Sequence, residues 1–206
     1  MARPSAREKI LDTAERLFAE HGLEGVSLRA INAEAGLSPA ALHYHFGTKQ
    51  ALVEALLERQ MPTLMERRRQ LLDALDDRPE APTTREVLDA LLRPQVELLA
   101  EGGEPGLRYL RLIHRLQSDG DLDPRFVIER WPGGVERLAP LLRKANPSLP
   151  LALIQLRLGL TIDAMLRSLA RGSAPGGGGL EAHMSSVLDF LTGGFEAPVT
   201  QPGPAS

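Results

Sequence analysis

The stretch that begins at Ser27 constrains this chain most, because it predicts two short helices joined by a tight turn. Ser27 is a candidate N-cap residue, and apolar residues follow it at helical spacing on one face. We expect Gly36 to end this helix, since glycine adopts the left-handed conformation of a sharp turn without a steric penalty. Ser38 and Pro39 then supply a second N-cap and a suitable first helical residue. The second helix should be short and end near Gly47.

The second helix is predicted to have two chemically different faces. At about 100° per residue, Leu42 and Phe46 share the face that points inward, and Tyr44 points roughly the opposite way. An apolar underside would hold this helix on the first one, while small, polar and aromatic side chains above could enter the major groove of DNA. The stretch therefore predicts a helix-turn-helix motif.

The same stretch resembles the signature of the tetracycline-repressor (TetR) family, roughly A-G-V-S, then L-Y-x-H-F-x-[ST]-K-x-x-L. The matching runs are AGLS at 35–38 and LHYHFGTK at 42–49, with Leu52 after them. The resemblance covers about the first quarter of the chain. It implies a three-helix DNA-binding head, a larger helical body, a dimer, and regulation of transcription by a ligand.

The resemblance also implies which residues contact DNA. By position, Tyr44 and His45 correspond to DNA contacts, Lys49 to a phosphate contact, and Ser27 and Arg29 to contacts from the first helix of the motif. The whole predicted DNA-binding set is Ser27, Arg29, Ser38, Pro39, Ala40, Ala41, His43, Tyr44, His45 and Lys49.

Two positions depart from the family pattern, so the base preference cannot be transferred. His43 stands where the family often has tyrosine, and Asn32 stands where it usually has alanine. Asn32 could lie at the edge of the packed face or be a polar contact, and we favour the first interpretation.

Charge and composition limit the classes of function. The net charge is −3, and residues 1–50 carry six Lys or Arg and six Asp or Glu, so the head is formally neutral. Phosphate contacts must then come from a few cations and backbone N–H groups, and a dimer would be needed for adequate affinity. The chain has no cysteine, which excludes disulfides and thiol catalysis. With no long apolar run and no signal-peptide pattern, we expect a cytoplasmic protein without a membrane partner.

We predict an all-α fold of about nine helices in three parts. Residues 1–50 form the helix-turn-helix DNA-binding domain, residues 51–195 a helical ligand-binding and dimerisation domain, and residues 196–206 a disordered tail. The first helix should run from about Ser5 to His21.

Prolines and glycines suggest the breaks within the body. Pro62 should bend or split the fourth helix, Thr84 should cap a helix that Pro94 interrupts, and Gly102–Gly106 should break the chain. The basic cluster at 66–69 is interpreted as a solvated helix face rather than as a DNA-binding patch.

The most apolar helix is predicted to begin at Leu151, and a glycine-rich linker at 172–179 separates it from a last helix at 180–191. In the TetR family these two helices form the dimer interface. A helix that its own body buries on one side and a partner on the other needs no polar face, so the sequence is compatible with this homodimer.

The Leu-rich body with isolated polar residues predicts a pocket for a small apolar ligand with a polar group. The candidate lining residues are Tyr109, His114, Trp131 and Asp163, with Arg157 or Arg167 as partners for a ligand anion. Each of these side chains also has an ordinary structural role as an alternative. The segment 88–169 weakly resembles family members whose ligands are fatty acyl compounds.

Two other classes of function were weighed. The sequence does not favour an enzyme, since it shows no nucleophile elbow, no HExxH motif and no phosphate-binding loop after a strand. His43 and His45 diverge on a short helix and make a poor metal pair, so we predict no metal and no cofactor. A helical scaffold with a degenerate head would leave the small surface at 40–44 unexplained. The sequence therefore favours a repressor that a small effector releases from a near-palindromic operator.

Overall fold

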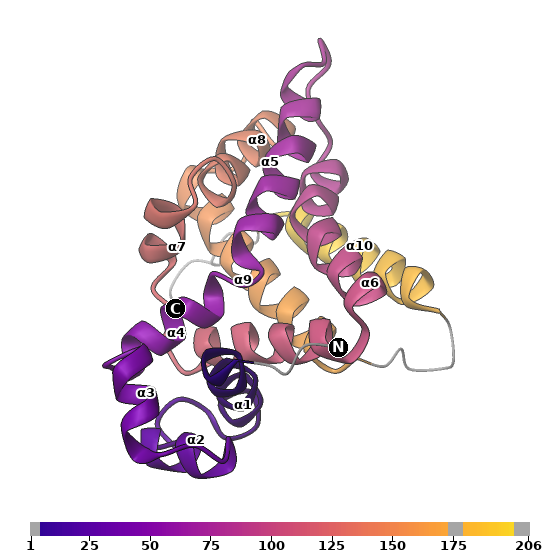
Figure 1. Cartoon of the computed structure of the whole chain (residues 1–206). Coiled ribbons are helices and arrows are strands. Elements are labelled where there is room, and N and C mark those ends of the chain that lie inside the picture. Colours follow the sequence, from indigo (N-terminus) through magenta and orange to yellow (C-terminus); the bar gives the residue numbers. More distant parts are fainter. Residues whose placement is uncertain (1–4, 173–178, 200–206) are drawn as a thin grey trace, which may run out of the picture.

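The computed structural model describes residues 5–172 and 179–199, which contain ten α-helices, one short 3-10 helix and no strand (Figure 1). The all-α prediction is confirmed, with one helix more than expected. Predictions for the extreme N-terminus, for most of the glycine-rich linker and for the end of the tail fall on residues 1–4, 173–178 and 200–206, outside the described residues.

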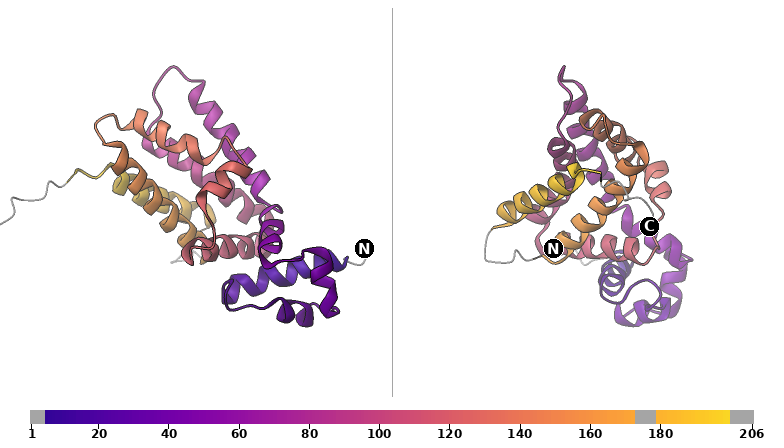
Figure 2. Two further views of the ribbon diagram at one scale, coloured as in Figure 1. Left: turned by 90° about the vertical axis from the view of Figure 1, so that its left-hand side faces the viewer. Right: turned by 180° about the vertical axis from the view of Figure 1, so that it is seen from behind.

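Three helices form a head at one end of the molecule: α1 (Ala6–His21), α2 (Leu28–Glu34) and α3 (Pro39–His45) (Figures 1 and 2). The Ser27 hydroxyl accepts a hydrogen bond from the backbone N–H of Ala30 at 3.1 Å, as an N-cap should. Gly36 has a φ of 64° and ends the turn after α2. Ser38 has N-cap backbone angles, but its side chain makes no capping hydrogen bond, which corrects that part of the prediction.

The head has an apolar core to which each of its helices contributes. Leu42 holds the underside of α3 in place and is 1% exposed. The other fully buried members around it are Ile10, Leu11, Ala14 and Phe18 of α1 and Ile31 of α2. The orientation of α3 is therefore set by burial of its underside.

Helix α4 (Lys49–Leu57) leaves the head, and α5 (Met61–Asp76) continues into the body. The predicted split near Pro62 is confirmed, but the break lies before the proline. Proline suits the first turn of a helix, where its missing N–H is not needed, so Pro62 lies in the first turn of α5 instead of kinking it.

Helix α6 (Thr84–Ser118) runs through the centre of the body and packs against α1, α5, α9 and α10. Pro94 does not interrupt it, which corrects the prediction, whereas Gly103 kinks it with a φ of 52°. Its N-cap is Thr83 rather than Thr84, because Thr83 and Glu86 form a capping box.

The remaining elements are α7 (Pro124–Arg130), the 3-10 helix η1 (Val135–Arg137), α8 (Leu138–Ala145), α9 (Leu151–Ala170) and α10 (Leu180–Glu196). The last helix is one turn longer than predicted, since Leu191 and Phe195 continue its buried stripe. None of the helices in the described ranges has the length and apolar character that a membrane span requires.

We expect Glu86→Gln to lower stability at neutral pH by on the order of 0.5 kcal/mol, because the carboxylate is exposed and its ion pair is screened. The Arg78 guanidinium, and then the backbone and hydroxyl of Thr83, hold the pKa of Glu86 at about 2, below its ordinary value of 4.5. A carboxyl whose pKa is lowered in the folded state stabilises the folded protein at pH values above its unfolded-state pKa. This contribution is lost as the pH falls towards the folded-state pKa. Urea denaturation should therefore show a smaller difference between the two proteins at about pH 3 than at about pH 7. An equal difference at both pH values would contradict this account.

Candidate functional site

Helix α3 presents a small, mostly exposed surface on the side away from its buried underside. Tyr44 is 86% exposed and stands with its ring edge-on to His45, at 5.2 Å between ring centroids. Of the other predicted DNA contacts, the exposed ones are Ser27, Arg29, Ser38, Ala40, His43 and His45, and the partly exposed ones are Ala41 and Lys49. The side chain of Pro39 lies outside the described part of the chain. The predicted DNA contacts on α3 whose side chains the structure describes are thus exposed or partly exposed.

Asn32 does not belong to this surface. It is 4% exposed and is turned into the packed interior of the head. This position agrees with the interpretation that Asn32 belongs to the packed face rather than being a polar contact.

The connection between α4 and α5, residues 58–60, is held to α1 by a cluster of ion pairs. The guanidinium of Arg59 lies 2.7 Å from Glu8, 2.7 Å from Asp12 and 3.2 Å from Glu15. Arg108 of α6 approaches the other oxygen of Glu15 at 3.3 Å. Burial raises the pKa of Glu15, and the two arginines oppose that shift. This cluster joins the head to the body.

Two further contacts fix the same connection. The buried Tyr109 hydroxyl of α6 donates a hydrogen bond to the carbonyl of Leu57 at 3.1 Å. Arg130 at the end of α7 donates to Glu58 at 2.7 Å. Residues 57–59 are therefore bound by α1, α6 and α7 at once.

An apolar cavity of about 130 Å³ lies in the body, between α5, α6, α7 and α9. Met61, the first residue of α5, belongs to its wall and follows directly on the connection just described. The remaining wall residues are Leu64, Met65, Arg68, Leu91, Gln95, Leu110, Ile113, Gln117, Leu122, Pro124, Val127, Val135, Ile162, Met165 and Leu166. A concave, mostly apolar space between helices is the kind of place where proteins bind small ligands.

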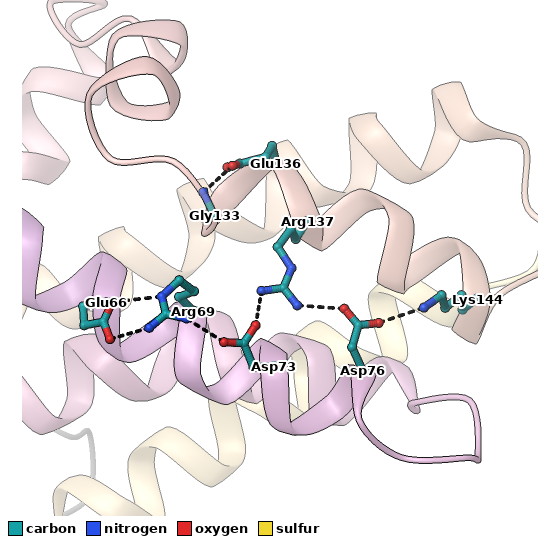
Figure 3. A network of polar contacts seen from close by, with 8 residues as sticks. All are labelled: Glu66, Arg69, Asp73, Asp76, Gly133, Glu136, Arg137 and Lys144. Atoms are coloured by element: carbon teal, nitrogen blue, oxygen red, sulfur yellow. Dashed lines mark hydrogen bonds and ion pairs between the residues drawn. The ribbon is translucent and has the colours of Figure 1, made fainter.

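A network of ion pairs holds η1 and α8 against α5 (Figure 3), and Val135 of η1 belongs to the cavity wall. Arg137 lies 2.6 Å from Asp73 and 2.7 Å from Asp76, and Lys144 lies 2.8 Å from Asp76. The loop before η1 consequently runs close to α5. A Cβ atom on Gly134 would lie 3.1 Å from the sulfur of Met65, so this position leaves little room for a side chain.

Comparison with known proteins agrees with this arrangement of head and body. The family model "Bacterial regulatory proteins, tetR family" matches residues 10–56, and the model "Tetracyclin repressor-like, C-terminal domain" matches residues 89–194. The two matches span the helix-turn-helix head and most of the body. The chain belongs to the TetR family of transcriptional regulators.

Individual TetR-family proteins match over almost the whole chain. The HTH-type transcriptional repressor AcnR of Corynebacterium efficiens is 25% identical over 196 residues, which is 94% of each chain. The structure of the ketosteroid regulator KstR2 of Mycobacterium tuberculosis is 22% identical, with a TM-score of 0.63 over 94% of this chain and 96% of that one. The structure of FadR from Bacillus subtilis in complex with stearoyl-CoA is 18% identical, with a TM-score of 0.58. This match covers 91% of this chain and 98% of the FadR chain. The two structures support the TetR fold.

The residues predicted to line a ligand pocket do not converge on one place in this TetR-family body. Tyr109 lies at the connection to the head, and Trp131 packs edge-on against Phe126 at 5.9 Å between ring centroids. His114 and Asp163 share a polar pocket with Gln117 and Arg167. None of the four candidates is among the residues that line the apolar cavity.

The polar candidates have partners within the protein. Asp163 is exposed and accepts a hydrogen bond from Gln117 at 2.6 Å. Arg157 donates to the backbone carbonyl of Phe195 and thereby joins α9 to α10. Burial lowers the pKa of His114, and the nearby Arg167 and Arg115 add to that effect.

Sequence reasoning did not identify the residues of the cavity wall, and Arg68 is the charged residue among them. Arg67 and Arg69 are partly exposed and ion-paired, as a solvated helix face predicts, but Arg68 between them is 2% exposed. The signal was the helical period, since Arg68 follows Leu64 by four residues and precedes Leu72 by four on the buried stripe of α5.

We expect Arg59→Met to destabilise the protein by about 2 kcal/mol, because it leaves the buried carboxylate of Glu15 with Arg108 alone. Urea denaturation would measure the loss. Adding Glu15→Gln to this variant should recover part of the stability, since a neutral amide then replaces the buried carboxylate. Arg7→Met is the matched control, because Arg7 is half exposed and pairs with Glu8 on the surface at 3.4 Å. A loss as small as that of the control would refute the role assigned to Arg59.

Proposed function

We propose that this TetR-family regulator is a dimeric repressor, and that a small effector in the apolar cavity releases it from its operator. The observation that carries the proposal is the 86% exposure of Tyr44 on a helix whose opposite face is buried. A large aromatic side chain held in solvent by a rigid, small-residue helix is a feature that a groove-reading head requires. The small residues at the start of α3 let its backbone approach the DNA.

The proposed homodimer forms through α9 and α10, which pack against each other in each subunit (Figure 2). Leu156 and Leu160 of α9 are each 59% exposed, and Phe190 of α10 is 75% exposed. Large apolar side chains that gather on the surface mark an interaction site. The formally neutral head also favours a dimer, because two heads double the number of phosphate contacts.

The proposed coupling runs through α5. A ligand in the cavity would contact Met61 and Leu64, and α5 begins directly after the connection that Arg59 and Tyr109 hold. A shift of α5 would therefore change the angle between α4 and the body, and with it the spacing of the two heads. Ligand-operator coupling of this kind is typically about 1–3 kcal/mol.

Two lines of support favour a small apolar or amphipathic effector. The cavity wall is mostly apolar and carries only three polar side chains, Arg68, Gln95 and Gln117. FadR of Bacillus subtilis, which has the same fold, was solved in complex with stearoyl-CoA. The predicted residues at 109, 114, 131 and 163 lie outside this wall, so the proposal places the effector at the cavity instead.

We expect Tyr44→Ala to abolish operator binding, on the order of a hundredfold or more, because it removes the main aromatic contact of α3. Fluorescence anisotropy with the DNA that flanks the protein's own gene, against shuffled DNA of equal length, measures the effect. Tyr44→Phe is the matched variant that keeps the ring and removes the hydroxyl. Both variants should remain dimeric in sedimentation. Wild-type affinity in Tyr44→Ala would show that α3 is not the recognition helix.

We expect Leu156→Glu to convert the dimer into monomers, because a buried glutamate without a partner opposes association. Sedimentation velocity at micromolar protein concentration measures the change, and thermal unfolding shows whether the subunit stays folded. Val199→Glu is the control, since Val199 is 53% exposed and lies beyond the last helix. A dimer that persists in Leu156→Glu would place the interface elsewhere.

A further inference from the structure

Arg68 is an unusual component of an apolar cavity wall. It lies on α5, is 2% exposed and is among the largest fully buried side chains of the protein. The side chains around it on the wall include Met61, Leu64 and Met65. The cavity is therefore an apolar space with a guanidinium group on one side.

The guanidinium of Arg68 has few partners among the described residues. One Nη donates a hydrogen bond to the carbonyl of Leu91 at 3.0 Å, and the other lies 3.4 Å from the sulfur of Met65, a weak acceptor. Its Nε is buried without a hydrogen bond, and no carboxylate of the described chain lies within ion-pair distance. Gln95, on the same wall, also has a buried side-chain oxygen without a hydrogen bond.

The neighbouring arginines show that this lack of a partner is specific to position 68. Arg67 makes two hydrogen bonds of 2.9 Å to Glu97, and Arg69 lies 2.7 Å from Glu66. Each of these two exposed cations has a carboxylate, whereas the buried cation between them has none. A buried ion is the one that most needs a counter-ion, because it has lost its hydration.

Arg68 remains charged despite its burial. Loss of hydration lowers the pKa of the guanidinium to about 10, which is still well above neutral pH. An uncompensated buried charge is unfavourable, and an anion that enters the cavity would compensate it. A carboxylate matches the planar fork of an arginine and can accept two parallel hydrogen bonds.

We propose that the cavity binds a small monocarboxylate whose carboxylate pairs with Arg68 and whose apolar body lies against Met61, Leu64 and Leu110. This inference rests on the proposed function, because it takes the cavity to be the effector site. The wall carries a single cation and is otherwise mostly apolar, so one anionic group and a hydrocarbon body suit it.

The size of the cavity limits the hydrocarbon body. Its volume of about 130 Å³ is close to that of an engineered protein cavity of roughly 150 Å³ that binds benzene. One aromatic ring or a short acyl chain fits this space. Phenylacetate and hexanoate are therefore suitable probes.

Isothermal titration calorimetry of the full-length protein, in a buffer without carboxylate or phosphate, tests the charge preference. Phenylacetate is compared with phenylacetamide and hexanoate with hexanamide, because each pair differs mainly in charge. We expect each acid to bind at least tenfold more tightly than its amide. Arg68→Met should lose this preference and retain weak binding of the amides. Arg68→Lys keeps the charge and should keep part of the preference.

Arg67→Met is the matched control, since it removes the adjacent exposed cation and should leave the preference unchanged. Thermal unfolding checks the variants, and we expect Arg68→Met to be no less stable than the wild type, because it removes an unpaired buried charge. If the wild type binds acids and amides equally, or binds neither, the inference is overturned, whatever binding the variants show. A preference that survives in Arg68→Met overturns it as well.

Operator binding is measured separately, with and without phenylacetate or hexanoate. If an acid binds through Arg68 but leaves operator affinity unchanged, the inference stands and the effector role in the proposed function fails. If the acid binds through Arg68 and weakens operator binding, both stand. The two proposals can therefore fail independently.

Discussion

The position of the DNA-binding head depends on the ion pairs that hold Arg59 against α1. This side chain lies between α4 and α5 and contacts three carboxylates of α1, of which that of Glu15 is nearly buried. A helix connection of three residues would otherwise be free to bend. Tyr109 adds a hydrogen bond to Leu57 from the centre of the body. A few directional polar contacts thus hold the three-residue connection between head and body.

In the proposed function, these contacts transmit the effect of a ligand from the cavity to the head. The wall of the cavity includes the first turn of α5 and part of α7, and both helices reach the same connection, through Met61 and through the Arg130–Glu58 pair. On the other side, the network in Figure 3 fastens η1 and α8 to α5. A ligand would then act on α5 as a rigid element rather than on single side chains.

The sequence predicted the head far better than the cavity, because the head is determined by interactions between residues close in sequence and the cavity by packing between distant helices. N-caps, turn glycines and a period of 3.6 residues are local, so Ser27, Gly36 and the inward position of Leu42 could be inferred directly. The predicted N-cap of α6 was wrong by one residue, Thr84 instead of Thr83. Both threonines are good N-cap residues, and only the contact with Glu86 decides between them. Pro94 was expected to break α6, but burial of both flanking segments against neighbouring helices maintains it. The helical period can place Arg68 on the buried face of α5, but whether that face borders a cavity depends on how four helices pack together.

Arg68 shows how one side chain can give a cavity chemical selectivity as well as a mechanical role. Its guanidinium donates to the carbonyl of Leu91, so it links α5 to α6 within the cavity wall. A guanidinium has five N–H donors, and the contacts with Leu91 and Met65 use only part of them. An anion would therefore bind the free edge of the same group that joins these two helices. Helix α5 follows the connection at residues 58–60, and α6 carries Tyr109, which bonds to Leu57. A change in the position of Arg68 would therefore act on this connection through both helices. A neutral ligand of the same shape would fill the cavity without acting on this link, since it has no charge with which to attract the guanidinium.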